Sequence, residues 1–251
     1  MENPFFSVIT ICKNSENHIL ECLISVNNQT FKDYEHVICD GNSTDGTIEI
    51  IDKNKKANTK LFIENDKGLY HALNKGIKKC NGKYILILHS DDKFFKNTVL
   101  ENLNKEIISN DYPFIVITNI IYVNSKGTLI RRWESDLPSI KKIQRGWMAP
   151  HTGLVLKKEI ANLLGPYDTN FEISADYDYE IRLFESYSKD IKLSNITLTE
   201  MKIGGLSNRN IKSIIKKTLE DFKIMRNNAI NPFVGLFFKN FSKISQFWKQ
   251  I

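Results

Sequence analysis

Four short apolar runs in the first 90 residues, separated by helical patterns, limit this chain to a small number of folds. Amphipathic helical patterns over Glu16–Asn28, from Thr47 and over Tyr70–Lys79 separate the runs. Strands that alternate with helices form a parallel sheet covered by helices. The sequence therefore predicts an α/β fold with a Rossmann-like, mainly parallel sheet. The four predicted strands are Ser7–Cys12, Glu35–Cys39, Lys60–Ile63 and Tyr84–Leu88.

Acidic loops follow three of these predicted strands. Asp40 follows the second, Glu64 and Asp66 follow the third, and the pair Asp91-Asp92 follows the fourth. Parallel sheets bind ligands outside the carboxyl ends of their strands, so these loops are expected at one edge. Paired carboxylates there suit a divalent cation such as Mg²⁺ or Mn²⁺ that itself holds a diphosphate. The alternative is a solvated turn or a helix cap.

The pattern changes after residue 110. Residues 113–118, 120–123, 128–133 and 154–156 are β-like, with a turn at 124–127. These elements are expected to form a mixed or antiparallel half that closes the far side of a cleft. A helix over Tyr177–Tyr187 follows, with Tyr177, Ile181 and Phe184 on its apolar face.

Composition narrows the function classes. The chain has 251 residues and a net charge of +6. From residue 208 onward there are nine Lys and Arg against two acids, whereas the preceding part has 26 against 27. No nucleic-acid recognition motif accompanies this basic tail. The four cysteines form no C-x-x-C pair, which favours reduced thiols. Because no signal peptide or membrane span is present, a cytoplasmic protein is expected.

Five motifs follow one another along about residues 5–207. They are Ser7-Val8-Ile9-Thr10, Asp40-Gly41-x-Ser43-x-Asp45-Gly46-Thr47, Glu64-x-Asp66-x-Gly68-x-x-x-Ala72-x-Asn74-x-Gly76, Ser90-Asp91-Asp92 and Ala175-Asp176-Tyr177-Asp178. In these motifs and their order, the chain resembles the family 2 inverting glycosyltransferases of the GT-A fold. The resemblance implies transfer of a sugar from a nucleotide diphosphate donor to an acceptor hydroxyl, with inversion at the anomeric carbon.

The resemblance implies a donor site with the following roles. Asp92 is expected to bind Mn²⁺ or Mg²⁺ directly, and Asp91 to hold the ribose or the water shell of the metal. Asp40 is expected to accept hydrogen bonds from the base, Asp66 to contact the base or its neighbouring ribose, and the backbone of Thr10 to line the nucleoside pocket. A UDP-sugar is the expected donor, because it is the commonest donor of the family.

The resemblance also implies an acceptor side. Inversion needs a base opposite the leaving group, and Asp176 is assigned this role. Asp178 lies about 200° away around the helix and is expected to support it. His151 matches a histidine that relatives place near the diphosphate and acceptor, although a structural role is an equal alternative. The turn Gly204-Gly205-Leu206-Ser207 matches one that closes over the donor phosphates.

The predicted organisation is a nucleotide-sugar-binding half (1–110), an acceptor-binding half (111–207) and a basic amphipathic helical extension (208–251). One apolar stripe runs through residues 211–225 and a second through 237–251. Packing on the catalytic domain or a second subunit is expected for the first stripe. For the second, peripheral contact with the inner face of the cell membrane competes with homodimerisation. Membrane contact suits an acceptor glycan carried on a lipid in surface polysaccharide synthesis.

Two other functions remain open on the sequence. A sugar nucleotidyltransferase shares the α/β plan, but it needs a glycine-rich phosphate loop after the first strand, and Lys13-Asn14-Ser15-Glu16 contains no glycine. A non-catalytic homologue that docks to a membrane assembly is the second alternative. Metal-dependent binding of a nucleoside diphosphate distinguishes the enzyme from this binding module.

Overall fold

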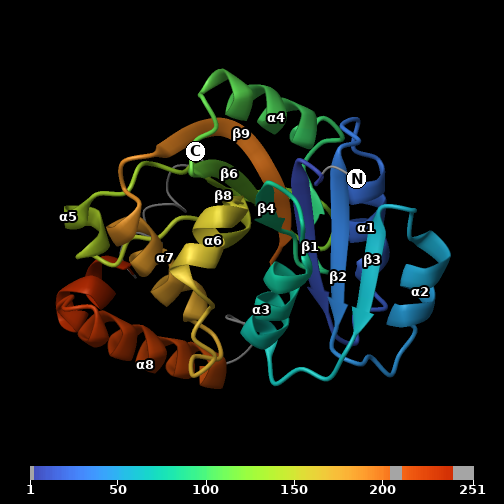
Figure 1. The fold of residues 1–251 in the computed structure, drawn as a ribbon. Coiled ribbons are helices and arrows are strands. Elements are labelled where there is room, and N and C mark those ends of the chain that lie inside the picture. Colours follow the sequence, from blue (N-terminus) through green and yellow to red (C-terminus); the bar gives the residue numbers. More distant parts are fainter. Residues whose placement is uncertain (1–2, 204–210, 240–251) are drawn as a thin grey trace.

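One nine-stranded sheet forms the centre of the molecule in the computed structural model, which describes residues 3–203 and 211–239 (Figure 1). The strand order is β3-β2-β1-β4-β8-β6-β9-β5, and β7 pairs with β6. The strands are β1 Phe6–Cys12, β2 Tyr34–Asp40, β3 Thr59–Ile63, β4 Tyr84–Ile87, β5 Lys93–Phe94, β6 Ile115–Val123, β7 Leu129–Trp133, β8 Leu154–Lys157 and β9 Ile191–Lys202. The helices are α1 Ile19–Asn27, α2 Thr47–Asn54, α3 Leu69–Lys79, α4 Val99–Ser109, α5 Ile140–Ile143, α6 Lys158–Leu164, α7 Ala175–Ser186 and α8 Ile211–Asn227.

Strands β1 to β4 are mutually parallel, which confirms the predicted sheet and places the loops that follow them at one edge. Both faces of this half are covered by helices. On β1, Ile9 and Ile11 belong to the core that α3, α6 and α7 share, while Phe6 and Val8 belong to the core under α1 and α4. Burial on both faces explains why β1 and β2 are apolar runs without an alternating polar pattern.

Two motif glycines have structural reasons. Gly68 precedes α3 with a φ of +136°, a conformation that glycine adopts readily. Gly76 lets α3 approach β1, because a Cβ at this position would lie 2.6 Å from the Ile9 Cγ2 atom. Both residues therefore fix how α3 enters and packs on the sheet.

The second half of the sheet is mixed, as predicted. β8 lies between β4 and β6 and is antiparallel to both, while the long β9 runs parallel to β6. Residues 113–118 and 120–123 were expected as separate strand segments, but β6 continues through Asn119 with irregular pairing to β9. α4 and β9 were not predicted at all.

The C-terminal segment packs on the rest of the chain. Ile224, Met225 and Ile230 are buried in the same core as α7, and residues 232–239 are helical. The predicted boundary after residue 207 and the turn at 204–207 lie outside the described residues, as does most of the second apolar stripe. Within residues 3–203 and 211–239, no helix has the length and apolar character to cross a membrane.

Candidate active site

The loops after β1, β2 and β4 are joined by hydrogen bonds at the carboxyl edge of the sheet. The Asn14 backbone N–H donates to the Ser43 hydroxyl over 2.8 Å, and the Ser15 and Ser90 hydroxyls lie 3.0 Å apart. The Asp40 carboxylate lies beneath this rim, where Ser43 donates to it from its backbone N–H over 2.7 Å and from its hydroxyl over 2.6 Å. Asp40 is fully buried, so its predicted contact with a base needs an approach through the rim.

The two adjacent carboxylates have different surroundings. Asp91 is partly exposed, whereas Asp92 is only 3% exposed and its Oδ2 atom has no hydrogen-bond partner within residues 3–203 and 211–239. Burial, and then the neighbouring Asp91 charge, raise the pKa of Asp92 well above its ordinary value. Of the pair, Asp91 is therefore the carboxylate that a ligand in the cleft can reach without rearrangement.

A histidine pair lies next to this acidic loop. The rings of His89, at the end of β4, and His151, in the turn before β8, have centroids 6.0 Å apart. His151 Nε2 lies 2.9 Å from the Tyr167 hydroxyl. Burial lowers the pKa of His151 to about 4, although the nearby Asp176 opposes the shift. His151 is therefore neutral at physiological pH and acts as a hydrogen-bonding group there.

Asp176, the predicted base, lies in the first turn of α7, and its charge acts on both His89 and His151. The Tyr70 hydroxyl lies 3.0 Å from Asp176 Oδ1 and 2.8 Å from the Ile173 carbonyl oxygen. Asp178 instead pairs with Arg182, with 2.9 Å between Oδ2 and Nε. The two carboxylates face different partners, in agreement with the predicted angle between them around the helix.

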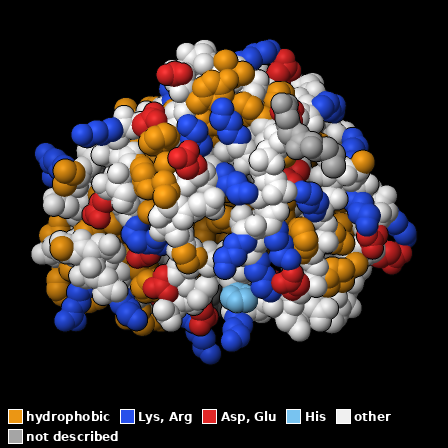
Figure 2. Space-filling model, viewed as in Figure 1, with side chains coloured by type: hydrophobic (Ala, Val, Ile, Leu, Met, Phe, Trp, Pro, Cys, Tyr) orange, Lys and Arg blue, Asp and Glu red, His pale blue; other side chains and the backbone are white. Residues whose placement is uncertain are grey.

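Thr10 and Asp66 lie apart from this cluster. Thr10 is fully buried inside the sheet, where its hydroxyl lies 2.9 Å from His36 Nε2. Asp66, after the edge strand β3, pairs with Lys75 over 2.8 Å and lies 3.3 Å from His71 Nδ1. Figure 2 shows other Lys and Arg side chains around α3 on this face.

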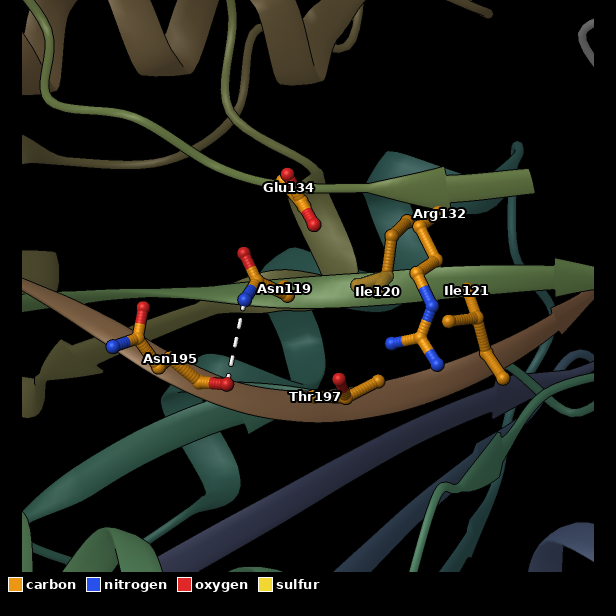
Figure 3. A pocket seen from close by; sticks show the side chains of 7 residues that line it. All are labelled: Asn119, Ile120, Ile121, Arg132, Glu134, Asn195 and Thr197. Atoms are coloured by element: carbon orange, nitrogen blue, oxygen red, sulfur yellow. Dashed lines mark hydrogen bonds between the residues drawn. The ribbon is translucent and has the colours of Figure 1, made fainter. Parts of the chain in front are cut away.

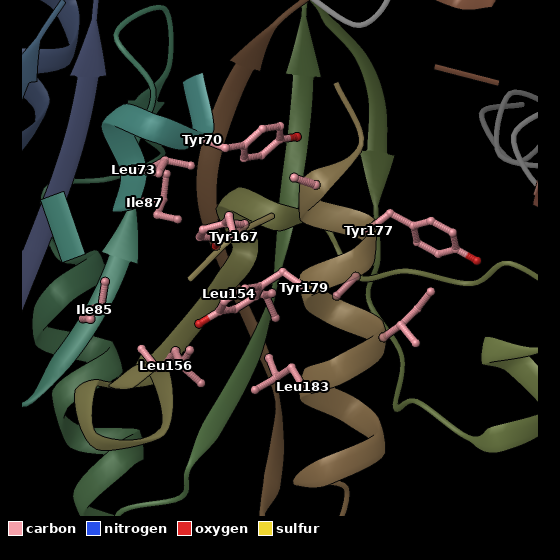
Figure 4. Close-up of a cluster of buried hydrophobic side chains, with 14 of the residues drawn as sticks. Tyr70, Leu73, Ile85, Ile87, Leu154, Leu156, Tyr167, Tyr177, Tyr179 and Leu183 are labelled. Carbon is pink, nitrogen blue, oxygen red and sulfur yellow. The ribbon is translucent and has the colours of Figure 1, made fainter. Parts of the chain in front are cut away.

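Four residues that support the cluster were missed in the sequence. Tyr70, Tyr167 and Tyr179 form a stack, with centroid distances of 5.6 Å and 4.1 Å between neighbouring rings (Figure 4). In this stack, the Tyr167 ring contacts the His151 ring, and the Tyr70 hydroxyl contacts Asp176. Glu180, one turn after Asp176, accepts a hydrogen bond of 2.7 Å from the Ala149 backbone N–H and so ties α7 to the His151 loop. A carboxylate on the apolar face of a helix was the available signal for Glu180.

A polar cavity of about 240 Å³ lies elsewhere, between β6, β7 and β9 (Figure 3). It is lined by Asn119, whose side chain leaves β6 on the opposite side from Thr118. The Thr118 hydroxyl donates to the Gly153 carbonyl beside His151. The cavity is therefore separated from the acidic cluster by the strand.

The residues around Asp91 suit a metal ion that a diphosphate also coordinates. Among the described residues, no group of three or more His, Cys, Asp or Glu side chains is arranged to hold an ion. Asp91 is nevertheless partly exposed, and the buried Oδ2 atom of the adjacent Asp92 has no hydrogen-bond partner in the part of the chain that the structure describes. Mg²⁺ and Mn²⁺ in such sites take one or two carboxylates and complete their shell with phosphate oxygens and water. The donor set fits a cation that arrives with a diphosphate.

Comparison with known proteins decides the family. The model of glycosyl transferase family 2 matches residues 7–163, which is more than half of the chain. The protein belongs to glycosyl transferase family 2. The match includes the acidic loops and His151 and ends before Asp176 and α8.

Individual relatives agree with this assignment. A PGL/p-HBAD biosynthesis glycosyltransferase of Mycobacterium bovis is 26% identical over 212 residues, covering 83% of this chain and 81% of the relative. Chondroitin synthase of Pasteurella multocida is 27% identical over 91% of this chain, but the match spans only 23% of that enzyme.

Solved structures share the GT-A fold. S. aureus TarS superposes with a TM-score of 0.66 at 19% identity, over 86% of this chain and 42% of TarS. The mannosyltransferase PcManGT from Pyrobaculum calidifontis, solved with GDP-Man and Mn²⁺, gives a TM-score of 0.67 at 17% identity, over 95% of this chain and 70% of the other. The family 2 glycosyltransferase described here therefore has the predicted fold.

Proposed function

We propose that this glycosyltransferase inverts the anomeric centre of a nucleotide diphosphate sugar, with Asp176 as the base. The observation that carries the proposal is the placement of Asp176 beside the His89, Asp91 and His151 cluster, with Tyr70 fixing one of its oxygens. In the reaction, an acceptor hydroxyl attacks the anomeric carbon from the face opposite the diphosphate. Its proton passes to the Asp176 carboxylate, while the bond from carbon to the diphosphate oxygen breaks and the electron pair leaves with the nucleoside diphosphate.

In this proposal the donor diphosphate binds next to Asp91. The partial exposure of Asp91 supports it as the ligand of Mn²⁺ or Mg²⁺, in place of the buried Asp92 that the sequence favoured. When bound, the cation supplies positive charge to the leaving diphosphate. Neutral His151 offers a hydrogen bond to the donor or acceptor, because its low pKa excludes an imidazolium at neutral pH.

The nucleoside is placed over the rim formed by the loops after β1 and β2. Ser43 donates to both carboxylate oxygens of Asp40, and the Cys12 thiol donates to Oδ2 over 3.3 Å, so Oδ1 is the oxygen that can accept a further hydrogen bond from a base. Thr10 supports this floor from within the sheet, and Asp66 lies at the outer edge of the rim. UDP is the preferred donor nucleotide, and a TarS structure in complex with UDP-GlcNAc supports this choice at the level of the fold.

The acceptor is proposed to be a lipid-linked glycan, reached at the cytoplasmic face of a membrane. Apolar side chains of α8 support membrane contact: Ile211 is 76% exposed and Leu219 65% exposed, and Phe233 beyond the helix is 77% exposed. The exposed Lys212 lies on the same helix, which suits an anionic lipid surface. The sequence favoured packing of this stripe on the catalytic domain or on a second subunit, and its exposed residues leave a second subunit as the competing explanation.

Cosedimentation tests the membrane contact. The wild-type protein should pellet with vesicles that contain phosphatidylglycerol and remain in the supernatant with phosphatidylcholine alone. Leu219→Glu should weaken pelleting, and Glu185→Lys, on the exposed side of α7, is the control. Equal recovery with both lipids would contradict the proposal, as would a wild-type homodimer that Leu219→Glu converts to a monomer.

A donor screen tests the proposed reaction. UDP, GDP and dTDP are compared by calorimetry with Mn²⁺ and with EDTA, and the corresponding sugars are then offered with lipid-linked saccharides. We expect metal-dependent binding of one nucleotide, transfer by the wild type, and loss of transfer in Asp176→Asn with the nucleotide affinity unchanged. Absence of metal-dependent nucleotide binding would support a non-catalytic homologue instead.

A further inference from the structure

The carboxylate of Glu220 binds the backbone immediately before Asp176. Its Oε1 accepts a hydrogen bond of 3.1 Å from the Glu172 N–H, and its Oε2 accepts bonds of 2.9 Å from the N–H groups of Ile173 and Ser174. Glu220 lies on α8, about 45 residues further along the chain and beyond the residues that the family model matches. One side chain thus binds three successive backbone donors.

These three donors lie in the segment that leads into α7. Ser174 is the residue before α7, so its N–H is one of the groups at a helix N-terminus that lack a partner within the helix, whereas the N–H groups of Glu172 and Ile173 precede the helix. The Ser174 side chain makes no capping hydrogen bond. Glu220 binds the Ser174 N–H and places negative charge next to the helix N-terminus, where the helix dipole favours it.

The same turn is held from its other side by Tyr70. Its hydroxyl lies within hydrogen-bonding distance of both the Ile173 carbonyl and Asp176 Oδ1. Ile173 therefore has its N–H bound by Glu220 and its C=O next to the Tyr70 hydroxyl. Only Ser174 and Ala175 separate Ile173 from Asp176, so few backbone torsions remain between the held residues and the carboxylate.

We infer that Glu220 is a positioning residue for Asp176, and that α8 is thereby a working part of the catalytic centre. This inference rests on the proposed function, because it assigns Asp176 the role of base. Displacement of a reacting group by about 1 Å can reduce the rate about 10²-fold. Loss of Glu220 should release residues 172–174 and therefore lower the turnover number. The proposed donor site around Asp91 and Asp40 should remain intact.

Other contacts dock α8 independently of Glu220. Ile224 and Met225 are fully buried in the core shared with α7. Asp221 pairs with Lys239 over 3.0 Å, and the Lys239 Nζ atom lies 3.4 Å from the centroid of the Tyr177 ring on α7. A variant at Glu220 is therefore expected to fold with α8 in place, which separates positioning from docking.

Two variants and a matched control test the inference. Glu220→Ala removes all three acceptor contacts, while Glu220→Gln keeps one acceptor oxygen and removes the charge. Lys216→Ala is the control, because Lys216 pairs with the side chain of Glu172 in the same turn and makes no contact with its backbone N–H. We expect kcat to fall about 10- to 100-fold in Glu220→Ala and less in Glu220→Gln. The donor KM and the affinity for UDP should remain within about twofold, and Lys216→Ala should match the wild type.

Hydrogen exchange supplies a readout that does not need activity. The amides of residues 172–174 should exchange faster in Glu220→Ala, with protection of α8 unchanged. Wild-type kcat in a folded Glu220→Ala would overturn the inference, as would a parallel loss of kcat, UDP affinity and melting temperature, which indicates a general structural role. A wild type that transfers no sugar would overturn the proposed function together with this role, whereas an active wild type with an equally active Glu220→Ala overturns the positioning role alone.

Discussion

Replacement of Asp92 by Asn should stabilise the protein and preserve nucleotide binding. Asp92 is 3% exposed, and its Oδ2 atom has no partner among the described residues; burial, and then the neighbouring Asp91 charge, raise its pKa above the ordinary 3.8. A carboxyl of this kind binds more protons in the folded state than in the unfolded state. Folding stability is therefore lost as the pH rises from about 3.8 through the folded-state pKa. Asn cannot ionise and removes this loss.

The size of the effect follows from the linkage relation. Each unit by which the folded-state pKa exceeds its ordinary value costs about 1.4 kcal/mol at neutral pH. For a chain of this length, about 1 kcal/mol shifts Tm by roughly 2–4 °C. At pH 7.5, Asp92→Asn should therefore melt about 3–6 °C above the wild type for each such unit, and the difference should shrink towards pH 4.

Thermal melting with and without UDP and Mn²⁺ measures both parts of this prediction. The partly exposed Asp91 gives the comparison variant, Asp91→Asn, which should keep the wild-type Tm and lose at least about tenfold in Mn²⁺-dependent UDP affinity. Asp92→Asn should keep that affinity. The opposite pattern, with metal-dependent binding lost in Asp92→Asn and kept in Asp91→Asn, would refute the reasoning and restore Asp92 as the metal ligand.

Three further predictions concern protonation, the base and the metal. Burial lowers the pKa of His36 to about 3, so the unfolded state binds the extra proton below pH 6.5 and stability falls on acidification. Urea unfolding should show that His36→Gln loses about 2 kcal/mol less than the wild type between pH 7.5 and pH 5; equal losses would count against the assignment. Tyr70→Phe removes the side-chain contact of Asp176 Oδ1 and leaves the hydrogen bond from the Tyr177 N–H, and it should lower kcat about 10- to 100-fold with donor KM unchanged; unaltered steady-state kinetics would show that the Tyr70 contact does not matter for catalysis. EDTA should abolish UDP binding and Mn²⁺ should restore it, whereas calorimetric titrations that are unchanged by EDTA would exclude a metal-bridged diphosphate.

The parallel half of the fold was predictable because its signals are local. β1 and β2 are buried on both faces and therefore appear in the sequence as short apolar runs. β9 lacks such a run: its exposure varies along its length, and it contains polar residues such as Asn195 and Thr197. Its place in the sheet comes from pairing with β6, 76 residues away at Asn119 and Asn195, and no local pattern encodes that contact.

The site was predictable to the same extent. The acidic loops follow strands whose order along the edge is fixed by parallel pairing, so Asp40, Asp66 and Asp91 could be placed on one rim. Exposure could not be read in the same way. Asp91 and Asp92 are neighbours with equal chemistry, and only the fold buries one of them. Tyr70 contacts Asp176 across 106 residues of chain, and Glu220 contacts the backbone before Asp176 across 46 to 48 residues, and sequence spacing does not reveal either contact.

The anomeric configuration of the product tests the central claim most directly. Once a donor has been identified, the initial product is formed by the wild type and by Asp176→Asn, and its configuration is determined by NMR from the anomeric coupling constant. The account predicts a product with the configuration opposite to that of the donor, formed by the wild type and absent with Asp176→Asn. A retained configuration, or equal product formation by the two proteins, would contradict the role of Asp176 as the base of an inverting transfer.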